Sequence, residues 1–358
     1  MKNIFKFLKI QDGIGEPPWE YAFLYNLSES EYPKYLAKIF KYRTGKNLNL
    51  KHPKTFNEKI QWIKLYGVTD LMRKCTDKVA VRDYVKNKIG EEYLKPVLQI
   101  ILNESHETVR CHCEQVNDNL GLARQSTDGS HDILDCRADN KMSLSARNDG
   151  ELDDVSTYFD KINFDKLPNA FVIKCNHGCK WQYIIKDKNL FLDNKRMFDI
   201  VKRNITGWLE QDYSFWNGFE MQYHSITPKI LIEPFIYNEI NKPCEEMHVY
   251  CFNGIPKFAV KQFINGENII SVFDEKLNHS DKIFSCVEKN VKINTGKPEK
   301  QMFDLSEQLS RDFAFARVDW MLYQEKIYFE EITFTPLSGF GNIINQNFNE
   351  ILGKLINI

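Results

Sequence analysis

The residues best suited to chemistry interrupt two strongly apolar runs near the C-terminal end of the chain. Arg317 and Asp319 lie two residues apart in the first run, and Glu331 and Thr333 lie two residues apart in the second. Successive side chains of a strand project to opposite faces, so the members of each pair share a face. A hairpin between the two runs would therefore gather two carboxylates and a hydroxyl.

Two carboxylates that face each other across neighbouring strands repel unless a cation lies between them. Hard oxygen ligands with no Cys or His nearby favour Mg²⁺, which typically takes one or two carboxylates together with substrate phosphates and water. Asp319 and Glu331 are therefore predicted to bind magnesium. The alternative is a solvated polar face with Arg317 as the balancing charge, and the apolar surroundings of both runs argue against it.

A second polar segment lies inside a hairpin-like region in the middle of the chain. Lys174 ends an apolar run, Asn176-His177-Gly178 follows, and a further apolar run covers Gln182–Lys186. A strand-end ammonium beside a turn with accessible backbone N–H groups has the geometry of a nucleotide phosphate loop. Taken by itself, an ordinary hairpin turn with a solvated lysine is the stronger interpretation.

The third segment is the apolar run Ile230–Ile236, which Glu233 and Pro234 interrupt. Proline has no backbone donor, so this strand should lie at a sheet edge or end there, and its free backbone groups can then bind the edge of an adenine ring. By itself the segment is better interpreted as an ordinary edge strand with a solvated Glu233.

These residues need strands to position them, and the sequence predicts an α+β fold. Strand-like runs are closely spaced between turn signals: Ala170–Cys175, Gln182–Lys186, Ile230–Ile236, His248–Phe252, Lys257–Gln262, Ile269–Phe273, Phe313–Leu322 and Ile327–Phe334. A helix is expected from Asn194 to about Asp212. Upstream, the capping box Thr55–Glu58 predicts one helix start, and Thr76 is expected to cap a second helix that stops at a left-handed Gly90.

Composition narrows the classes of function. The 48 Lys and Arg residues nearly balance 49 Asp and Glu residues, so no overall field favours a nucleic-acid partner. No stretch approaches the roughly 20 apolar residues of a membrane span. Nine cysteines without a framework spacing, and no recognisable signal peptide, favour a reducing compartment, so we expect a cytoplasmic protein. Residues 103–150 lack aromatic side chains and are predicted to form a flexible insertion.

The order and wording of these motifs resemble the TupA-like branch of the ATP-grasp superfamily, ligases of polysaccharide and teichuronopeptide synthesis. The resemblance extends from about residue 35 to the C-terminus, and it is carried by Thr55–Trp62, Asp77–Val85, Lys174–Gly178, Cys251–Phe258 and Arg317–Gly339. It implies an ATP-grasp fold in which a mobile lid covers a C-terminal antiparallel sheet. The expected parts are a mainly helical region at 1–102, the insertion at 103–156, the lid at 157–240 and the catalytic part at 241–358.

The resemblance also implies a nucleotide site. Lys78 and Lys174 match the two lysines that contact phosphates, and His177, Gly178 and Lys186 accompany them. The adenine hinge matches Glu233, Pro234, Phe235 and Ile236, and the ribose-binding acid matches Glu239. Two positions depart from the family pattern. Cys179-Lys180 stands where the branch has Ser-Gly, and His248 stands where Lys or Arg is usual.

For the catalytic centre, the resemblance implies that Asp319 and Glu331 are the Mg²⁺ carboxylates and that Thr333 stands where many relatives have an Asn ligand. Arg317 matches the arginine that steadies the acyl phosphate. Ser338, with Gly339, falls where relatives of the D-Ala–D-Ala ligase type bind an acceptor carboxylate.

The implied reaction is attack of a substrate carboxylate on the γ-phosphoryl of ATP, followed by attack of an amine on the acyl phosphate. We expect small-molecule or glycan-linked substrates of surface polysaccharide synthesis, and the resemblance allows peripheral contact with the polysaccharide assembly machinery. A glycosyltransferase is one alternative, although neither an Asp-x-Asp motif nor a doubly wound N-terminal sheet is evident. A degenerate module that binds nucleotide without turnover is the other.

Overall fold

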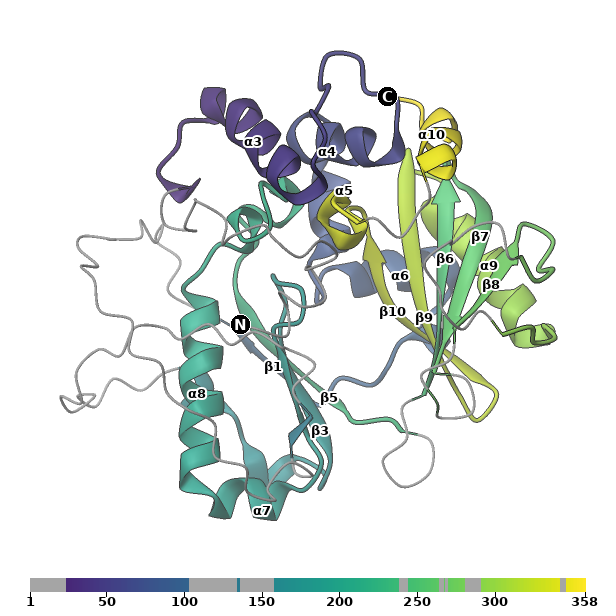
Figure 1. The fold of residues 1–358 in the computed structure, drawn as a ribbon. Helices are drawn as coiled ribbons and strands as arrows, with labels where there is room; N and C mark the ends of the chain where they lie inside the picture. Colours follow the sequence, from purple (N-terminus) through teal and green to yellow (C-terminus); the bar gives the residue numbers. More distant parts are fainter. Residues whose placement is uncertain are drawn as a thin grey trace. The chain divides into compact units, whose positions relative to one another are not determined.

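The computed structural model describes residues 24–102, 158–237, 244–263, 270–280, 291–341 and 346–358, with Glu267 and the short strand Leu134–Asp135 in addition. Apart from that strand, the predicted insertion at 103–156 lies outside the described residues, as does the predicted ribose ligand Glu239. The chain divides into two compact units (Figure 1). Unit 1 is built around Pro96–Gln211 and Thr227–Phe235, and unit 2 contains Trp19–Lys95, Asp212–Ile226 and Ile236–Ile358.

Unit 1 contains a five-stranded antiparallel sheet in the order β1-β5-β3-β4-β2. Its strands are β1 (Gln99–Leu102), β2 (Leu134–Asp135), β3 (Phe171–Cys175), β4 (Gln182–Ile185) and β5 (Lys229–Pro234). The helical elements are η3 (Tyr158–Lys161), η4 (Phe164–Lys166), α7 (Lys188–Asp193) and α8 (Lys195–Leu209). The predicted helix after Asn194 is confirmed as α8. Asn194 caps its start, because the Asn194 side chain accepts a hydrogen bond from the Met197 N–H at 3.1 Å.

The two faces of this sheet differ in polarity. Alternate side chains of Phe171–Cys175 are fully buried on the face covered by α8, where the ring of Trp208 stacks on that of Tyr183 with centroids 5.5 Å apart. Lys174 occupies an intervening position of β3 and therefore projects to the opposite face. The register pairs Val172 with Glu233, so Glu233 shares the face of Lys174. Lys174 and Glu233 thus both project from the face away from α8.

Unit 2 contains the second antiparallel sheet, in the order β10-β9-β6-β7-β8. Its strands are β6 (Glu245–Phe252), β7 (Ile255–Gln262), β8 (Ile270–Asp274), β9 (Phe315–Tyr323) and β10 (Lys326–Thr333). Its α-helices are α3 (Tyr32–Thr44), α4 (Phe56–Tyr66), α5 (Asp70–Thr76), α6 (Val81–Ile89), α9 (Lys297–Ser310) and α10 (Gln346–Leu355). Its short 3-10 helices are η1 (Glu29–Glu31), η2 (Glu91–Tyr93), η5 (Tyr213–Phe215), η6 (Met221–Tyr223) and η8 (Pro336–Gly339). Together, the helices and the two antiparallel sheets confirm the predicted α+β class.

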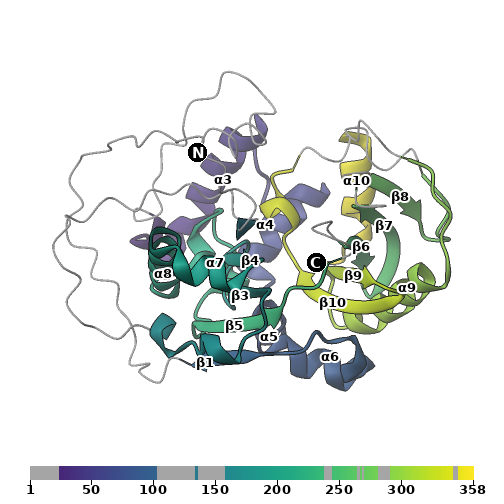
Figure 2. The same cartoon turned by 90° about the horizontal axis from the view of Figure 1, so that it is seen from below.

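Helices cover both faces of the second sheet, and Figure 2 shows these helices and strands. On one face α9 lies against the strands, and Trp320 Nε1 donates a hydrogen bond to Ser306 Oγ of α9 at 2.8 Å. On the other face α4 contributes Phe56, whose ring packs edge-on against Phe315 with centroids 4.9 Å apart. That face is apolar where α4 covers it, and Asp319 lies further along the same strand.

One predicted helix cap is confirmed and one is wrong. At Thr55 the hydroxyl accepts a hydrogen bond from the Glu58 N–H at 3.2 Å, and Glu58 Oε2 accepts one from the Thr55 N–H at 3.0 Å. Thr76 instead ends α5, where its hydroxyl donates to the Met72 carbonyl at 2.8 Å. The next helix begins only at Val81 and ends, as predicted, before Gly90. Gly90 has φ +109° and ψ 159°, an extended conformation with positive φ rather than the left-handed helical one.

Within the part of the chain that the structure describes, no helix is both long enough and apolar enough to cross a membrane.

Candidate functional site

The hairpin of β9 and β10 gathers the predicted carboxylates. Its register pairs Asp319 with Glu331 and Arg317 with Thr333, so all four side chains share one face, as the alternation predicts. The register shifts between Phe329 and Glu331. Such a bulge re-aims the residues that follow it. The face is the one opposite α9, beyond the apolar end that α4 covers.

Arg317 supplies the positive charge between the two carboxylates. Its Nε and Nη2 donate to Asp319 Oδ1 at 2.7 Å and Oδ2 at 2.5 Å, a bidentate fork. Nη2 also lies 3.1 Å from Thr333 Oγ1 and 3.7 Å from Glu331 Oε1. Burial acts to lower the pKa of Arg317, but the charge and hydrogen bonds of Asp319 together with the charges of Tyr250 and Glu331 outweigh it, and the pKa is raised. Arg317 is therefore present as a balancing charge, as in the predicted alternative, on a face where Asp319 is buried and Glu331 is 36% exposed.

The donor set fits a magnesium ion. Asp319 and Glu331 offer carboxylate oxygens, and the Thr333 hydroxyl donates to Glu331 Oε1 at 3.0 Å. The side chain of Asp319 is 8% exposed and that of Glu331 is 36% exposed, so the second carboxylate is open to solvent. Mg²⁺ keeps several waters and substrate oxygens beside one or two carboxylates, which suits this pair. Across the described ranges, no cluster of three or more His, Cys, Asp or Glu side chains forms an all-protein metal cage.

The polar face continues onto the neighbouring strands. His248 of β6 is paired with Asp319, and its Nδ1 lies 3.7 Å from Asp319 Oδ1. Gln262 of β7 directs its Nε2 toward His248 Nε2 at 3.0 Å and toward Glu246 Oε2 at 2.9 Å. Polar side chains therefore run from the carboxylate hairpin across β6 to β7.

Unit 1 holds a second group, an ion pair between strands β3 and β5. Lys174 Nζ lies 2.8 Å from Glu233 Oε2, and the two side chains are 12% and 6% exposed. Neither side chain is solvated, so the predicted solvation of Lys174 and of Glu233 is wrong. Strand β5 lies between β1 and β3 and ends at Pro234, which settles the predicted choice between an edge strand and a strand end.

The Asn-His-Gly motif anchors its own turn. Asn176 donates to the Thr227 carbonyl at 3.0 Å and accepts from the Lys229 N–H at 2.7 Å. The ring nitrogens of His177 lie 3.1 Å from Asn176 Oδ1 and 3.0 Å from the Trp208 carbonyl. These bonds tie the β3–β4 turn to the start of β5 and the end of α8, so the side chains of the motif hold the loop in place.

Steric space and backbone conformation restrict which residues fit at two further positions of this turn. A Cβ on Gly178 would lie 2.3 Å from the ring of Trp181, so only glycine fits under the indole. Lys180 has φ +60°, a left-handed conformation that glycine adopts freely and lysine does not. This is the position where the resembling branch has glycine. The exposed lysine at the tip therefore retains the backbone shape of the loop while adding a charge.

The remaining predicted residues fall in three places. Lys186 follows β4, and the pairing of Lys174 with Gln182 puts Lys186 on the face of the Lys174–Glu233 pair. Lys78 lies in the turn between α5 and α6 of unit 2. Ile236 also belongs to unit 2, where its carbonyl accepts a contact from Cys244 Sγ at 3.5 Å. The structure thus gathers one predicted group in unit 1 and another, around Asp319, in unit 2.

Sequence reasoning missed the partners of Ser338. Its hydroxyl accepts a hydrogen bond from Lys64 Nζ at 2.8 Å and donates to the Asn217 carbonyl at 2.6 Å. Lys64 is fully buried on α4, near a buried Glu220. One signal was available: Ile60, Gln61 and Lys64 share the helical stripe that packs inward, so the period of the helix places Lys64 on a buried face.

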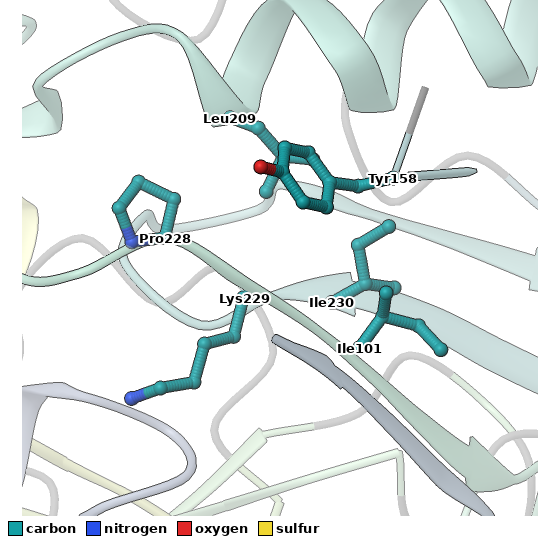
Figure 3. Close-up of a pocket in the computed structure, with 6 residues that line it drawn as sticks. All are labelled: Ile101, Tyr158, Leu209, Pro228, Lys229 and Ile230. Atoms are coloured by element: carbon teal, nitrogen blue, oxygen red, sulfur yellow. The ribbon is translucent and has the colours of Figure 1, made fainter. Parts of the chain in front are cut away.

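A hollow in unit 1 contains none of the predicted residues. It is lined by Ile101, Tyr158, Leu209, Pro228, Lys229 and Ile230 (Figure 3). The Lys229 amine points away from Tyr158 and Leu209 in this view, which leaves a mainly apolar lining. We assign no ligand to it.

Comparison with known proteins gives a family and a set of structural neighbours. A family model described as TupA-like ATPgrasp matches residues 151–357, more than half of the chain. D-alanine–D-alanine ligase from Helicobacter pylori is 13% identical, with 85% of this chain and 67% of that chain covered and a TM-score of 0.35. The Bacillus anthracis enzyme complexed with ATP is 16% identical, with 55% of this chain covered and a TM-score of 0.31.

A structure of the ATP-grasp ligase PsnB with a minimal precursor is 9% identical, with 52% and 46% covered and a TM-score of 0.27. The chain spans about half the length of the Bacillus anthracis ligase, 51%. No curated protein matches the chain. The family match, together with the two antiparallel sheets, confirms the predicted ATP-grasp fold.

Proposed function

We propose, from the premise that the chain belongs to the TupA-like ATPgrasp family, that it is an ATP- and Mg²⁺-dependent ligase that joins a carboxylate to an amine through an acyl phosphate. The observation that carries the proposal is the arrangement of Arg317, Asp319, Glu331 and Thr333 on one face of the β9–β10 hairpin. It combines hard oxygen ligands with a buried, permanently charged guanidinium, the two components that phosphoryl transfer to a carboxylate needs.

In this proposal Asp319 and Glu331 hold Mg²⁺, with the Thr333 hydroxyl as a further oxygen donor. When bound, the metal neutralises charge on the phosphate oxygens of ATP. Arg317 steadies the acyl phosphate, and its fork on Asp319 fixes the guanidinium plane before substrate arrives. Such preorganised charge lowers the barrier because it needs no reorganisation during the transfer.

Lys174 is proposed to contact the ATP phosphates. Its pairing with Glu233 keeps the ammonium on the polar face of the unit 1 sheet. His177 and Gly178 contribute by shaping the turn. The His177 ring contacts the Trp208 carbonyl, and the Trp181 ring occupies the space that a side chain at position 178 would need. The rest of the proposed nucleotide set is Lys78, Lys186, Pro234, Phe235, Ile236 and Glu239.

The proposed substrates are a sugar acid or amino acid and an amine of surface polysaccharide synthesis in the cytoplasm. A second candidate is a module that binds nucleotide without turnover. It is favoured by the ion pairs that engage both Lys174 and Asp319, because each must be rearranged or shared before ligands bind.

The test uses the full-length chain with Mg²⁺, ATP, hydroxylamine and a panel of uronic and amino acids. Hydroxylamine traps an acyl phosphate as a hydroxamate, so the proposal predicts hydroxamate together with equal amounts of ADP and phosphate. Release of AMP and pyrophosphate would contradict the acyl-phosphate step. Binding of Mg²⁺ and ATP with no product from any acid would favour the non-catalytic module.

The matched variants change a buried and an exposed lysine of unit 1. Lys174→Met combined with Glu233→Gln keeps the buried charge balanced and should lower ADP formation by roughly 100-fold, the typical loss for one charge-stabilising donor. Lys202→Ala removes a similar ion pair, with Asp160 at 2.6 Å, from the exposed side of α8 and should leave the rate unchanged. Equal rates in both variants would remove Lys174 from the nucleotide site.

A further inference from the structure

The bulge in strand β10 places two adjacent glutamates opposite one residue of β9. Phe329 pairs with Trp320, and Glu331 pairs with Asp319. Glu330 is therefore the extra residue of the bulged strand. In a regular strand the residue after Phe329 would face Asp319, and that residue is Glu330. Either glutamate could thus supply the second carboxylate of the proposed Mg²⁺ site, and the bulge decides which one does.

The apolar pattern of β10 explains why the strand bulges. Phe329 and Ile332 are both buried, and their partners Trp320 and Val318 lie two residues apart on the face that α9 covers. Side chains on one face of a regular strand are two residues apart, whereas Phe329 and Ile332 are three apart. Burying both on one face therefore needs one extra residue. Because β10 ends the strand order, β9 is the only described strand that fixes its register.

A buried lysine engages the extra glutamate. Lys95 Nζ lies 2.5 Å from Glu330 Oε1, and the two side chains are 10% and 25% exposed. Glu331 is 36% exposed and lies 3.7 Å from Arg317 Nη2. The two neighbouring carboxylates therefore face different cations. Lys95 neutralises Glu330, and the Glu331 carboxylate stays open to solvent.

The segment that carries Lys95 is itself fixed by its neighbours. Arg82 Nη2 of α6 donates to the Lys95 carbonyl at 2.6 Å. Two residues earlier, the Tyr93 ring packs edge-on against Trp320 with centroids 6.4 Å apart. The Tyr93 hydroxyl accepts a hydrogen bond from Gln301 Nε2 of α9 at 2.9 Å. The Lys95 ammonium is therefore held at the bulge by contacts that do not involve the carboxylate hairpin.

We infer that Lys95 and Glu330 are positioning residues. Their ion pair holds the extra residue of the bulge, so that Glu331 rather than Glu330 presents its carboxylate to Mg²⁺ beside Asp319. Groups that orient metal ligands typically change metal affinity about 10–100-fold when they are removed. This inference rests on the proposed Mg²⁺-dependent function, and it adds to the metal site two residues that do not bind the ion.

The decisive variant is Lys95→Met combined with Glu330→Gln, which removes both charges together and leaves no buried charge of the pair uncompensated. The matched control is Lys261→Met combined with Glu299→Gln. Lys261 Nζ lies 2.6 Å from Glu299 Oε1, their side chains are 8% and 6% exposed, and the register places Lys261 on the α9 face of the same sheet. The second partner of Lys261, Glu245, is 20% exposed and can be solvated.

The probe is Mn²⁺, because carboxylate and water ligands suit it as they suit Mg²⁺. Its binding to the full-length chain is measured from the paramagnetic signal of the free ion, with the metal alone and with ADP. Hydrogen exchange of a peptide covering 326–333 reports on the bulge, and thermal unfolding checks that each variant folds. In the decisive variant we expect this peptide to exchange about tenfold faster and Mn²⁺ to bind about tenfold more weakly. The control variant should change neither.

Two single substitutions support the assignment independently. Arg82→Gln removes the donor to the Lys95 carbonyl, so it should shift exchange and Mn²⁺ affinity in the same direction by a smaller factor. Glu330→Gln keeps an acceptor oxygen for Lys95, so Mn²⁺ affinity should fall far less than it does in Glu331→Gln.

Four results would overturn the inference. Unchanged exchange in the decisive variant would show that the ion pair does not hold the bulge. Faster exchange with unchanged Mn²⁺ affinity would show that the bulge does not position Glu331. An equal loss of affinity in the control variant would assign the effect to lost stability. A loss in Glu330→Gln as large as in Glu331→Gln would make Glu330 itself a metal ligand.

Failure of the proposed function would give different results. If the unaltered chain bound no Mn²⁺, the metal site itself would be removed. If it bound Mn²⁺ but formed no hydroxamate, only the ligase reaction would be removed. Exchange of the 326–333 peptide is measured without ligand, so it decides in either case whether Lys95 and Glu330 hold the bulge.

Discussion

Replacing Asp319 with Asn should destabilise unit 2 far more than replacing Glu331 with Gln. The two carboxylates face each other in the same hairpin, but they differ in burial and in their contacts with Arg317. Asp319 is 8% exposed and forked by a guanidinium that is itself 14% exposed, whereas Glu331 is 36% exposed and 3.7 Å away. Neutralising Asp319 leaves the arginine buried beside one distant carboxylate.

Breaking a buried ion pair typically costs about 3–5 kcal/mol. Asn keeps one acceptor oxygen for the fork, so we expect the lower end, about 3 kcal/mol. An exposed pair contributes roughly 0–1 kcal/mol, which sets the expectation for Glu331→Gln. At roughly 2–4 °C per kcal/mol, Asp319→Asn should lower Tm by about 6–12 °C, and Glu331→Gln by no more than about 4 °C.

The assay is urea unfolding of the metal-free protein, repeated with Mg²⁺ and ADP. Both variants should lose the stabilisation that the ligands give. The control is Asp312→Asn, which breaks an exposed pair with Lys88 at 2.8 Å and should cost about as little as Glu331→Gln. Relief of carboxylate repulsion would instead make Asp319→Asn more stable than the unaltered chain. That result, or equal effects of the two substitutions, would refute the role given to Arg317.

Three further outcomes are expected. Lys180→Gly should stabilise unit 1 by about 0.5–1 kcal/mol in urea unfolding, because glycine accepts the left-handed backbone, and a loss of stability would show that the lysine side chain supports the turn. Gly178→Ala should destabilise by about 1–3 kcal/mol, because its methyl group would meet Trp181, and a neutral effect would mean that the indole moves freely. The hydrogen bond to Asp212 raises the pKa of His224 above 6.5, so the stabilisation of the fold by this pair should be complete below pH 6.5 and lost as pH rises through the raised pKa. If a His224→Gln variant shows the same loss in pH-dependent melting, this pair is excluded as its cause.

The carboxylate hairpin could be predicted because its signals are local. Polar residues at alternate positions within apolar runs specify both strands and the face they share, and the observed register pairs Asp319 with Glu331. The capping box at Thr55 is equally local. Thr76 misled the prediction because a threonine hydroxyl at the end of a helix bonds back to a carbonyl as readily as it caps the next helix.

The contacts that could not be predicted join distant parts of the chain. Strand β1 is short and becomes a strand by pairing with β5, which follows it by more than a hundred residues. Glu233 looked solvated because nothing within its own segment shows that β3 will bring Lys174 beside it. Lys64 likewise meets Asn217 and Ser338, 153 and 274 residues away. Burial of a charged side chain depends on such partners, and periodicity shows only the face on which it lies.

The central claim is that the substrate carboxylate is phosphorylated, and oxygen transfer tests it most directly. In an acyl-phosphate reaction a carboxylate oxygen attacks the γ-phosphorus and ADP leaves. The amine then attacks the carbonyl carbon, and phosphate departs with that oxygen. With an ¹⁸O-labelled carboxylate, the account predicts one ¹⁸O atom in each inorganic phosphate released with ADP. Label in AMP, or phosphate without label, would contradict it.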